Sequence, residues 1–196
     1  MAVYSQEIPL GIKVPDFELL DVVSGRRRSL QELKSERATV IMFICNHCPY
    51  VKHILPTLVG FAREYSVKGV SFIAINPNDP EAYPEDSPDN MRRVALELGF
   101  PFPYLFDETQ EVARAYGAMC TPEFYLTDSE LRLLYHGRFD DSTPGNGLPV
   151  TGKELRAALE AVLAGRPVPY PQYPALGCSI KWRTQPEGGA ARARQS

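Results

Sequence analysis

The hydrophobic pattern of the chain alternates between buried strands and amphipathic helices. Residues 38–44 (ATVIMFI) form an unbroken apolar run rich in β-branched side chains, and residues 70–75 form a second such run. Runs of this kind are typical of central strands that are buried on both faces of a sheet. Apolar residues recur every three or four positions over residues 51–65, which predicts an amphipathic helix between the strands. We expect Pro56 to kink this helix and Gly69 to stop it.

Shorter runs, helix-spaced positions and Gly or Pro punctuation predict the other elements. We expect short strands at residues 16–20, 26–30 and 103–106, helices at residues 88–98, 108–116 and 151–163, and a hairpin of residues 124–127 with 131–137. The order β–α–β–α–β–α–β–β–α predicts an α/β protein with a mixed central sheet and helices on both faces. We expect one domain over residues 1–182, in which residues 1–37 are a lead-in and residues 166–182 an extended Pro-rich tail, followed by a disordered tail over residues 183–196.

A polar, Pro-rich loop follows the second apolar strand at residues 76–87 (NPNDPEAYPEDS). A loop of this length is a candidate functional loop, but its composition favours a solvated surface loop, which is our prediction. We expect four acidic residues in and after it to lie on the surface: Glu81, Glu85, Asp86 and Asp89. His136, inside a predicted strand, is expected to be a packed or half-exposed side chain rather than a catalyst.

Composition and charge narrow the possible functions. Hydrophobic residues make up 44% and charged residues 23% of the chain, and the net charge of −3 gives no basic excess for nucleic acid or an anionic membrane. No apolar run approaches the roughly 18 residues of a membrane span, and the first residues lack the pattern of a secretory signal. We therefore expect a cytoplasmic protein in a reducing compartment. There, four cysteines indicate catalytic, redox or metal-binding roles rather than a structural disulfide framework.

The candidate active site is the segment CNHCP at residues 45–49, where a predicted strand passes into a predicted helix. A cysteine at a helix N-terminus faces unpaired backbone N–H groups and the positive end of the helix dipole, and both stabilise a thiolate. Such sites lower a cysteine pKa from about 8.5 into the range of roughly 3.5–7.5. His47 directly precedes Cys48 and is expected to stabilise its thiolate further, by charge or by hydrogen bonding. The C-x-x-C spacing of Cys45 and Cys48 at this place indicates redox chemistry.

Five segments carry a family pattern: CNHCPYV at residues 45–51, YPED at 83–86, FPYLFDETQEVA at 102–113, TPE at 121–123 and GCSIKW at 177–182. In these segments the chain resembles the thioredoxin-like superfamily, and in particular its peroxiredoxin-like (AhpC/TSA-related) thioredoxin-fold proteins. The resemblance extends over about residues 8–182. It implies a thioredoxin fold, with a central mixed β-sheet flanked by helices, an N-terminal β extension and an extended C-terminal tail.

The resemblance allows two alignments with the thioredoxin active-site motif, in which a C-x-x-C pair precedes a helix proline. In the first, which we prefer, Cys48 takes the place of the nucleophilic cysteine and Pro56 that of the helix proline. Val51 then replaces the second cysteine, and Cys45 lies in the preceding loop. In the second, Cys45 and Cys48 occupy both cysteine positions but the helix proline is lost. Both alignments make Cys48 a key thiol and leave its resolving partner open.

The resemblance also assigns expected roles to three segments outside the motif. It identifies Thr121-Pro122 as the cis-proline loop, which faces the active-site cysteines and presents a backbone edge to a thiol or peptide substrate. Cys120 precedes this loop, and we expect a small buried hydrophobic residue there, with a redox role as the alternative. Cys178 belongs to the GCSIKW segment, and the tail could return it to Cys48 as a resolving cysteine, with a packing role as the alternative.

Three other functions compete with thiol–disulfide exchange. A peroxiredoxin-like thiol peroxidase needs P-x-x-x-T-x-x-C and an arginine, but Ile41 and Cys45 hold the proline and threonine positions, and Pro122 holds the arginine position. A metal-binding module for copper or zinc would use four ligands: Cys45, His47, Cys48 and His53. The third alternative is a thioredoxin-like scaffold with incidental thiols.

We therefore predict a thiol–disulfide oxidoreductase that needs no cofactor. The Cys48 thiolate attacks a substrate disulfide, and a second thiol, Cys45 as first choice and Cys178 as second, resolves the mixed disulfide. The expected partners are protein or small-molecule disulfides and thiols, with no nucleic acid and no membrane, and the sequence specifies no oligomeric state. Because a stabilised thiolate favours the reduced form, we expect a more oxidising couple than that of thioredoxin, which lies at roughly −270 mV.

Overall fold

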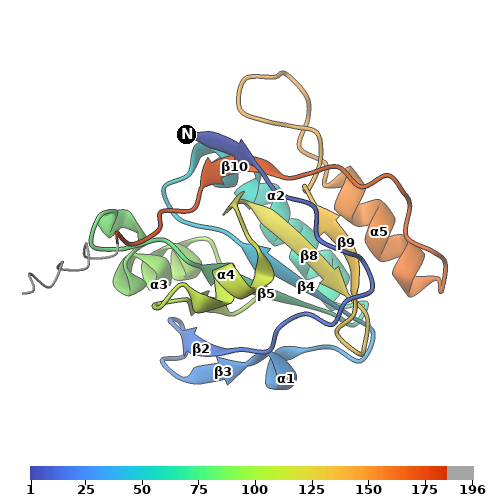
Figure 1. Ribbon diagram of the computed structural model, residues 1–196, viewed down its shortest axis with the longest axis horizontal. Coiled ribbons are helices and arrows are strands. Elements are labelled where there is room, and N and C mark those ends of the chain that lie inside the picture. The colour runs from blue at the N-terminus through green and yellow to red at the C-terminus, as the bar shows by residue number, and fades with distance from the viewer. Residues whose placement is uncertain (185–196) are drawn as a thin grey trace, which may run out of the picture.

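The computed structural model describes residues 1–184 (Figure 1). Its strands are β1 (Ala2–Tyr4), β2 (Glu18–Asp21), β3 (Arg27–Ser29), β4 (Ala38–Phe43), β5 (Val70–Asn76), β6 (Tyr104–Phe106), β7 (Cys120–Thr121), β8 (Glu123–Thr127), β9 (Leu133–Gly137) and β10 (Leu176–Ser179). Its helices are α1 (Leu30–Leu33), α2 (Pro49–Ser66), α3 (Pro88–Glu97), α4 (Glu111–Tyr116) and α5 (Lys153–Leu163), with a 3-10 turn, η1, at Pro84–Asp86. Beyond residue 184, the disordered tail predicted for residues 183–196 lies outside the described residues.

Seven strands form a central mixed sheet in the order β3-β2-β6-β5-β4-β8-β9. β4 pairs in parallel with β5 and antiparallel with β8, so it lies inside the sheet. Its residues point alternately to two cores: Val40 and Met42 join the core that contains α2 and α5, whereas Ile41 and Phe43 join the core that contains α4. All six residues of β4 are buried, which confirms the prediction of a central strand covered on both faces.

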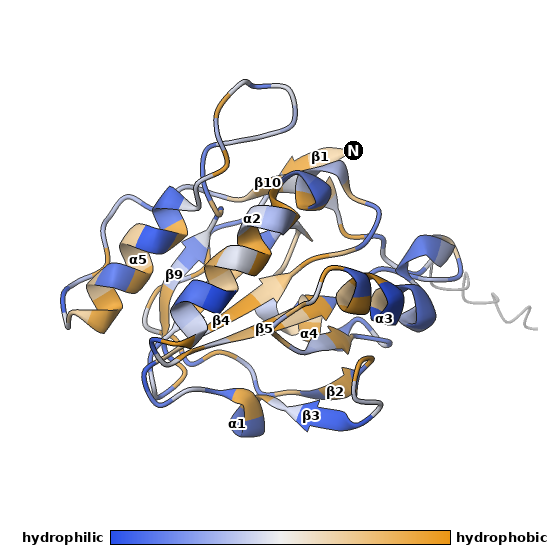
Figure 2. Ribbon diagram, turned by 180° about the vertical axis from the view of Figure 1, so that it is seen from behind, coloured by the Kyte–Doolittle hydropathy of each residue, from blue (hydrophilic) through white to orange (hydrophobic). Residues whose placement is uncertain are grey.

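The longest helix, α2, lies across the strongly hydrophobic strands β4 and β5 (Figure 2). It begins at Pro49 and continues through Pro56, which lies on its exposed side with Lys52. Proline cannot donate to the carbonyl four residues earlier, and here that carbonyl belongs to Lys52, where water can replace the lost bond. Within residues 1–184, no helix combines the length and the hydrophobicity needed to cross a bilayer.

A second sheet of three strands, in the order β1-β10-β7, joins the two ends of the described chain (Figure 1). In it, Cys178 pairs with Ala2 on one side and with Thr121 on the other. The segment predicted as an extended tail therefore contains a strand. The hydrophobic pattern predicts neither β1 nor β10, because each has three or four residues and takes its hydrogen bonds from strands distant in sequence.

A buried glutamate anchors the short connection between β7 and β8. The Glu123 side chain accepts hydrogen bonds from the backbone N–H groups of Met119 at 2.8 Å and Cys120 at 3.1 Å. It also accepts from the Tyr125 hydroxyl at 2.9 Å and lies 2.6 Å from the His136 ring nitrogen Nε2. His136 is buried, so the expectation of a packed side chain is confirmed. The carboxylate thus holds the loop through four donors.

Replacing Glu123 by Ala is expected to destabilise the fold by about 3–5 kcal/mol, because it leaves His136 and two backbone N–H groups buried without their acceptor. Urea denaturation of the purified variant measures the free energy of unfolding. The control is Glu130→Ala, since the Glu130 side chain is 76% exposed and its loss should change stability by less than about 0.5 kcal/mol. Equal stability of the two variants would contradict an anchoring role for Glu123.

Candidate active site

Cys48 is the N-cap residue of α2, directly after the loop that leaves β4. Pro49 follows as the first residue of the helix, a position that needs no N–H donor. The N-terminal end of α2 lies against β10 (Figure 1). Cys48 has no exposed surface. The structure therefore places this thiol where the sequence predicts it, at a helix N-terminus, and it also covers it completely.

Cys45 and the residue before Pro122 contact Cys48 inside this covered space. Both sulfurs lie against Thr121, and hydrogen bonding between the two thiols is the largest influence on the pKa of each. The Cys45 Sγ lies 3.3 Å from the hydroxyl of Thr121, and the Cys48 Sγ lies 3.4 Å from the carbonyl oxygen of Thr121. The Thr121-Pro122 peptide bond is cis, as the resemblance implies. The C-x-x-C pair and the proline loop thus form one cluster.

Cys178 brings a third sulfur to this cluster from the end of the described chain. Cys178 pairs in register with Thr121, whose carbonyl oxygen lies 3.4 Å from the Cys48 Sγ, and hydrogen bonding from its side chain and backbone N–H lowers the pKa of Cys48. The neighbouring Gly177 lets β10 come this close, because a Cβ there would lie 2.0 Å from the carbonyl oxygen of Thr121. Cys178 is half-buried, whereas Cys45 and Cys48 are fully buried, so it is the most exposed sulfur of the three.

Hydrogen bonds between these sulfurs set their acidities. The bond from Cys45 is the largest of the effects that lower the pKa of Cys48 to about 5, and it outweighs burial, which acts in the opposite direction. Bonds from Cys178 and from the backbone N–H of Val51, in the first turn of α2, lower this pKa further. The bond to Cys48, with burial, raises the pKa of Cys45 well above its ordinary value. Burial and the bond to Cys48 raise the pKa of Cys178 to about 11.

The fourth cysteine is not part of the thiol cluster's hydrogen bonding. Cys120 is fully buried, and its Sγ lies 3.7 Å from Glu123 Oε2 and 3.9 Å from the carbonyl oxygen of Ala175. Burial and the charge of Glu123 raise the pKa of Cys120. This environment keeps Cys120 protonated and fits the small buried residue that the sequence predicts.

His47 pairs with an acidic residue from the loop after β5. Its Nδ1 forms a hydrogen-bonded ion pair with Asp86, and its ring stacks on Tyr83 with 5.1 Å between the ring centroids. The hydrogen bond to Asp86 raises the pKa of His47 and outweighs burial. The charge of Cys48 also raises the pKa of His47, so His47 pairs with Asp86 and also interacts with the Cys48 thiolate.

The expectation that Asp86 lies on the surface is wrong. Its side chain is fully buried and accepts hydrogen bonds from the backbone N–H of Asn46 at 2.7 Å and from the amides of Asn76 and Asn78, both at 3.1 Å. Burial alone would raise the pKa of Asp86, but the hydrogen bonds from His47 and these groups outweigh it and lower the pKa. Asp86 therefore clamps the loop between β4 and α2.

The prediction of a solvated loop at residues 76–87 is therefore wrong at both ends, because Asn76 and Asn78 at its start are buried with Asp86. Glu81, Glu85 and Asp89 are exposed, as predicted. The sequence did carry one signal for Asp86, since it closes the YPED segment at residues 83–86 that contributes to the family resemblance. The polar composition of the loop favoured an exposed Asp86, because composition does not distinguish a buried aspartate from an exposed one.

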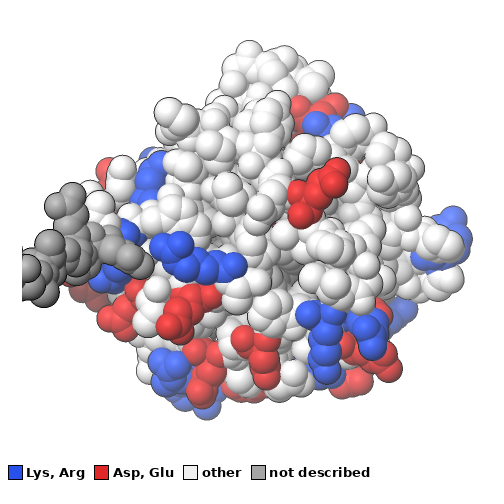
Figure 3. Space-filling view, viewed as in Figure 1, with Lys and Arg blue, Asp and Glu red and all other residues white. Residues whose placement is uncertain are grey.

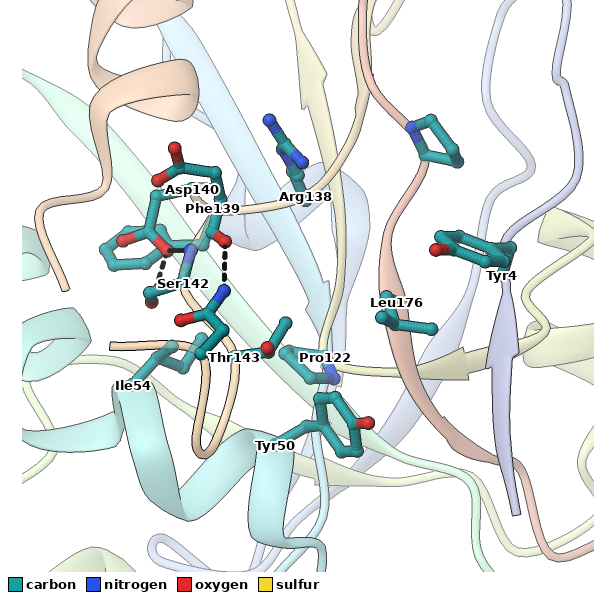
Figure 4. Close-up of a pocket in the computed structure, with 13 residues that line it drawn as sticks. Tyr4, Tyr50, Ile54, Pro122, Arg138, Phe139, Asp140, Ser142, Thr143 and Leu176 are labelled. Atoms are coloured by element: carbon teal, nitrogen blue, oxygen red, sulfur yellow. Dashed lines mark hydrogen bonds between the residues drawn. The ribbon is translucent and has the colours of Figure 1, made fainter. Parts of the chain in front are cut away.

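A pocket of about 260 Å³ opens beside Pro122. Figure 4 shows Tyr4, Tyr50 and Leu176 around it, from β1, α2 and β10. Leu176 and Cys178 are two residues apart in β10 and therefore point to the same face of that strand. The pocket thus adjoins the row of side chains that includes the third sulfur.

The charged groups near this pocket already have partners, and the buried Asp140 accepts hydrogen bonds from the Ser142 hydroxyl and from the backbone N–H groups of Thr151 and Gly152. Arg138 forms an ion pair with Glu154 at 2.5 Å, and Asp141 forms one with Lys153 at 2.6 Å. On the face seen in Figure 3, the surface around β1 and β10 is mostly uncharged, and charged side chains gather further down. The pocket therefore favours an uncharged, partly apolar group.

A set of possible metal ligands differs from the one predicted. Ligand atoms of Cys45, His47 and Asp86 lie within 4.8 Å of one another, whereas Cys48 and His53 are not in this group. Both carboxylate oxygens of Asp86 already accept hydrogen bonds, so a metal ion would have to displace them. This geometry suits the ion pair better than a metal centre.

One curated relative is the thiol-disulfide oxidoreductase ResA of Geobacillus thermodenitrificans, 26% identical over 121 residues. The match covers 62% of this chain and 64% of that protein, so the chain spans less than two-thirds of its relative's length. The crystal structure of an uncharacterized conserved protein from Geobacillus kaustophilus is 59% identical, with a TM-score of 0.93 over 95% of this chain and 98% of the other.

A thioredoxin domain of a thiol-disulfide oxidoreductase from Bacteroides vulgatus shares the fold, with a TM-score of 0.56 and 16% identity over 66% of this chain and 89% of that one. The predicted thioredoxin fold is thereby confirmed. The sequence model of the AhpC/TSA family matches residues 10–136, which are more than half of the chain. The protein therefore belongs to the AhpC/TSA family.

Proposed function

We propose that this protein is a thiol–disulfide oxidoreductase in which Cys48 is the reactive thiolate. The observation that carries the proposal is the cluster of three sulfurs at the start of α2, which holds the pKa of Cys48 at about 5. A thiolate is the form of cysteine that attacks disulfides, and Cys48 is in this form at neutral pH. The similarity to an enzyme named thiol-disulfide oxidoreductase supports the same chemistry.

The exchange begins when the Cys48 thiolate attacks one sulfur of a disulfide. The S–S bond of that disulfide breaks, a mixed disulfide forms on Cys48, and the other sulfur leaves as a thiolate. The negative charge on Cys48 is now gone, and with it the largest cause of the raised pKa of Cys45. Cys45 gives its proton to the departing thiolate and attacks Cys48, which releases the second sulfur as a thiolate that takes a proton from water. In balance, one disulfide becomes two thiols, and the two cysteines become a disulfide.

The pair of His47 and Asp86 acts on this exchange by position. Asp86 accepts a hydrogen bond from the backbone N–H of Asn46 and pairs with the side chain of His47. Both of these residues lie between Cys45 and Cys48 in the sequence. The pair fixes the loop, and because the charge of Cys48 adds to the raised pKa of His47, a protonated His47 also favours the thiolate. The loop therefore keeps Cys45 within hydrogen-bonding reach of Cys48.

The substrates we propose are disulfides and thiols of proteins or small molecules. The pocket beside Pro122 supports substrates that carry an uncharged group next to their sulfur. A location in a reducing cytoplasm stays a prediction from the sequence.

Replacing Cys48 by Ser is expected to reduce the catalysed reduction of insulin disulfides by dithiothreitol to the uncatalysed rate, because the variant has no thiolate at the helix N-terminus. In Cys45→Ser the resolving thiol is missing, so Cys48 should accumulate in a disulfide that is not resolved. Cys120→Ser is the matched control and should keep the full rate, since its sulfur faces Glu123. A Cys48→Ser variant that still catalyses the reaction would refute the proposed function.

The thiolate of Cys48 should appear as the pH rises through about 5, since its pKa is lowered to that value. Ultraviolet thiolate absorbance, taken as the difference between the native protein and Cys48→Ser, measures this titration without requiring access to the buried sulfur. In Cys45→Ala the midpoint should rise by at least about one pH unit, because the strongest donor is removed. An unchanged midpoint would show that Cys45 does not set the acidity of Cys48.

The stabilised thiolate should make the dithiol couple more oxidising than that of thioredoxin, so we expect a reduction potential above roughly −270 mV. Equilibration in graded glutathione buffers, followed by alkylation and mass spectrometry, measures the potential. A potential at or below that of thioredoxin would contradict the link between acidity and oxidising power.

A further inference from the structure

The reactive sulfur has no direct route to a substrate. Cys48 is 0% exposed and Cys45 is 2% exposed. Thiol–disulfide exchange needs contact between the attacking sulfur and the sulfur it attacks. A substrate outside the protein therefore cannot reach either sulfur while β10 is in place.

Cys178 lies next to Cys48 and is the partly exposed member of the cluster. It pairs in register with Thr121, whose carbonyl oxygen lies 3.4 Å from the Cys48 Sγ, and its strand β10 contacts the helix that Cys48 caps. Its own sulfur also receives a hydrogen bond from the backbone N–H of Tyr50, in the first turn of α2. One side of Cys178 thus faces the reactive thiolate, and the other side is accessible.

The position of Cys178 is fixed by the backbone on both edges of β10. Its register pairs it with Ala2 in β1 and with Thr121 in β7. Gly177 has no Cβ and therefore lets β10 lie against the Thr121 carbonyl. A thiol held this firmly against Cys48 is placed for chemistry with it rather than left at the end of a loose tail.

Resting on the proposed function, we propose that Cys178 is the thiol that exchanges with external substrates and that it forms a relay disulfide with Cys48. The disulfide that Cys48 attacks is then the mixed disulfide that a substrate forms on Cys178. Substrates then exchange electrons with the buried pair of Cys45 and Cys48 through Cys178, and the three-stranded sheet does not have to open.

The oxidation of substrate thiols shows how the relay balances. A substrate thiolate attacks the Cys178 sulfur of the Cys48–Cys178 disulfide, the S–S bond breaks, and Cys48 leaves as a thiolate. A second substrate thiolate attacks the substrate sulfur of the mixed disulfide and releases Cys178, which takes up a proton. Two substrate thiols become one disulfide, and the two cysteines take up its two electrons. Cys48 is the better leaving group because its thiolate is the more stable of the two.

Cys45 connects the relay to the buried pair. Its thiolate can attack Cys48 in the Cys48–Cys178 disulfide, which forms the Cys45–Cys48 disulfide and frees Cys178 as a thiolate that takes up the proton lost by Cys45. This step converts the Cys48–Cys178 disulfide into the Cys45–Cys48 disulfide, and it needs no external oxidant. Every step is reversible, so an external disulfide is reduced by the same sequence in the opposite direction.

The test uses the full-length Cys45→Ser variant, in which the inward step is blocked. The variant is oxidised with glutathione disulfide, freed of it, and mixed with reduced glutathione as the probe. Acid quenching at successive times, alkylation and peptide mass spectrometry then locate every disulfide. We expect a Cys48–Cys178 disulfide at the start and glutathione on Cys178 as the first adduct, with Cys48 free. Glutathione on Cys48 with Cys178 free would overturn the relay.

A second measurement compares single variants for the rate at which glutathione reduces the oxidised protein. Cys178→Ser should react about 10-fold more slowly than the native protein, because glutathione must reach the buried pair directly. Cys120→Ser, the matched control, should keep the native rate. Thermal unfolding of both variants shows whether they are folded, and the adduct position in Cys45→Ser tests the relay even if Cys178→Ser unfolds.

The outcomes separate the relay from the proposed function. A native rate in Cys178→Ser together with an inactive Cys48→Ser overturns the relay and leaves the oxidoreductase in place. Full activity in Cys48→Ser overturns both. Slow reaction in Cys178→Ser with glutathione first on Cys178 supports both.

Discussion

The close contact between β10 and the Thr121 carbonyl is the constraint on which the site depends. Gly177 makes the contact possible, since any side chain there would overlap the carbonyl oxygen. The contact closes the three-stranded sheet over the start of α2 and excludes water from Cys48. In such an environment a hydrogen bond has a larger electrostatic effect than in water. The same bonds therefore lower the pKa of one sulfur and raise those of its two neighbours.

Two buried carboxylates hold the loops on which the sulfurs and the proline are carried. Asp86 fixes the loop between β4 and α2, and Glu123 fixes the loop between β7 and β8. Each pairs with a histidine, His47 or His136, and each also accepts bonds from backbone N–H groups and polar side chains. A buried carboxylate without such partners would be costly, so both networks impose a defined geometry on their loops.

Membership of the AhpC/TSA family and the thioredoxin fold leave the reaction open, because one fold supports many chemistries. The surroundings of Cys48 are more informative. Within residues 1–184, the groups that lower its pKa most are thiols and backbone N–H groups, with no arginine among them. A thiolate stabilised by neighbouring sulfurs suits exchange between sulfurs, whereas peroxide cleavage needs a cation to polarise the attacked bond.

The sequence by itself determined the local features of this protein. The buried strand at β4, the helix α2 and the place of Cys48 between them follow from residue spacing, because hydrophobic periodicity and helix starts are local signals. The cis-proline loop followed from the family resemblance. Only the tertiary structure decided the pairing of β10, the burial of Asp86 and the contact of Cys178 with Cys48. Each of these depends on groups distant in sequence, and the burial of a polar side chain is set by partners that its own neighbours do not reveal.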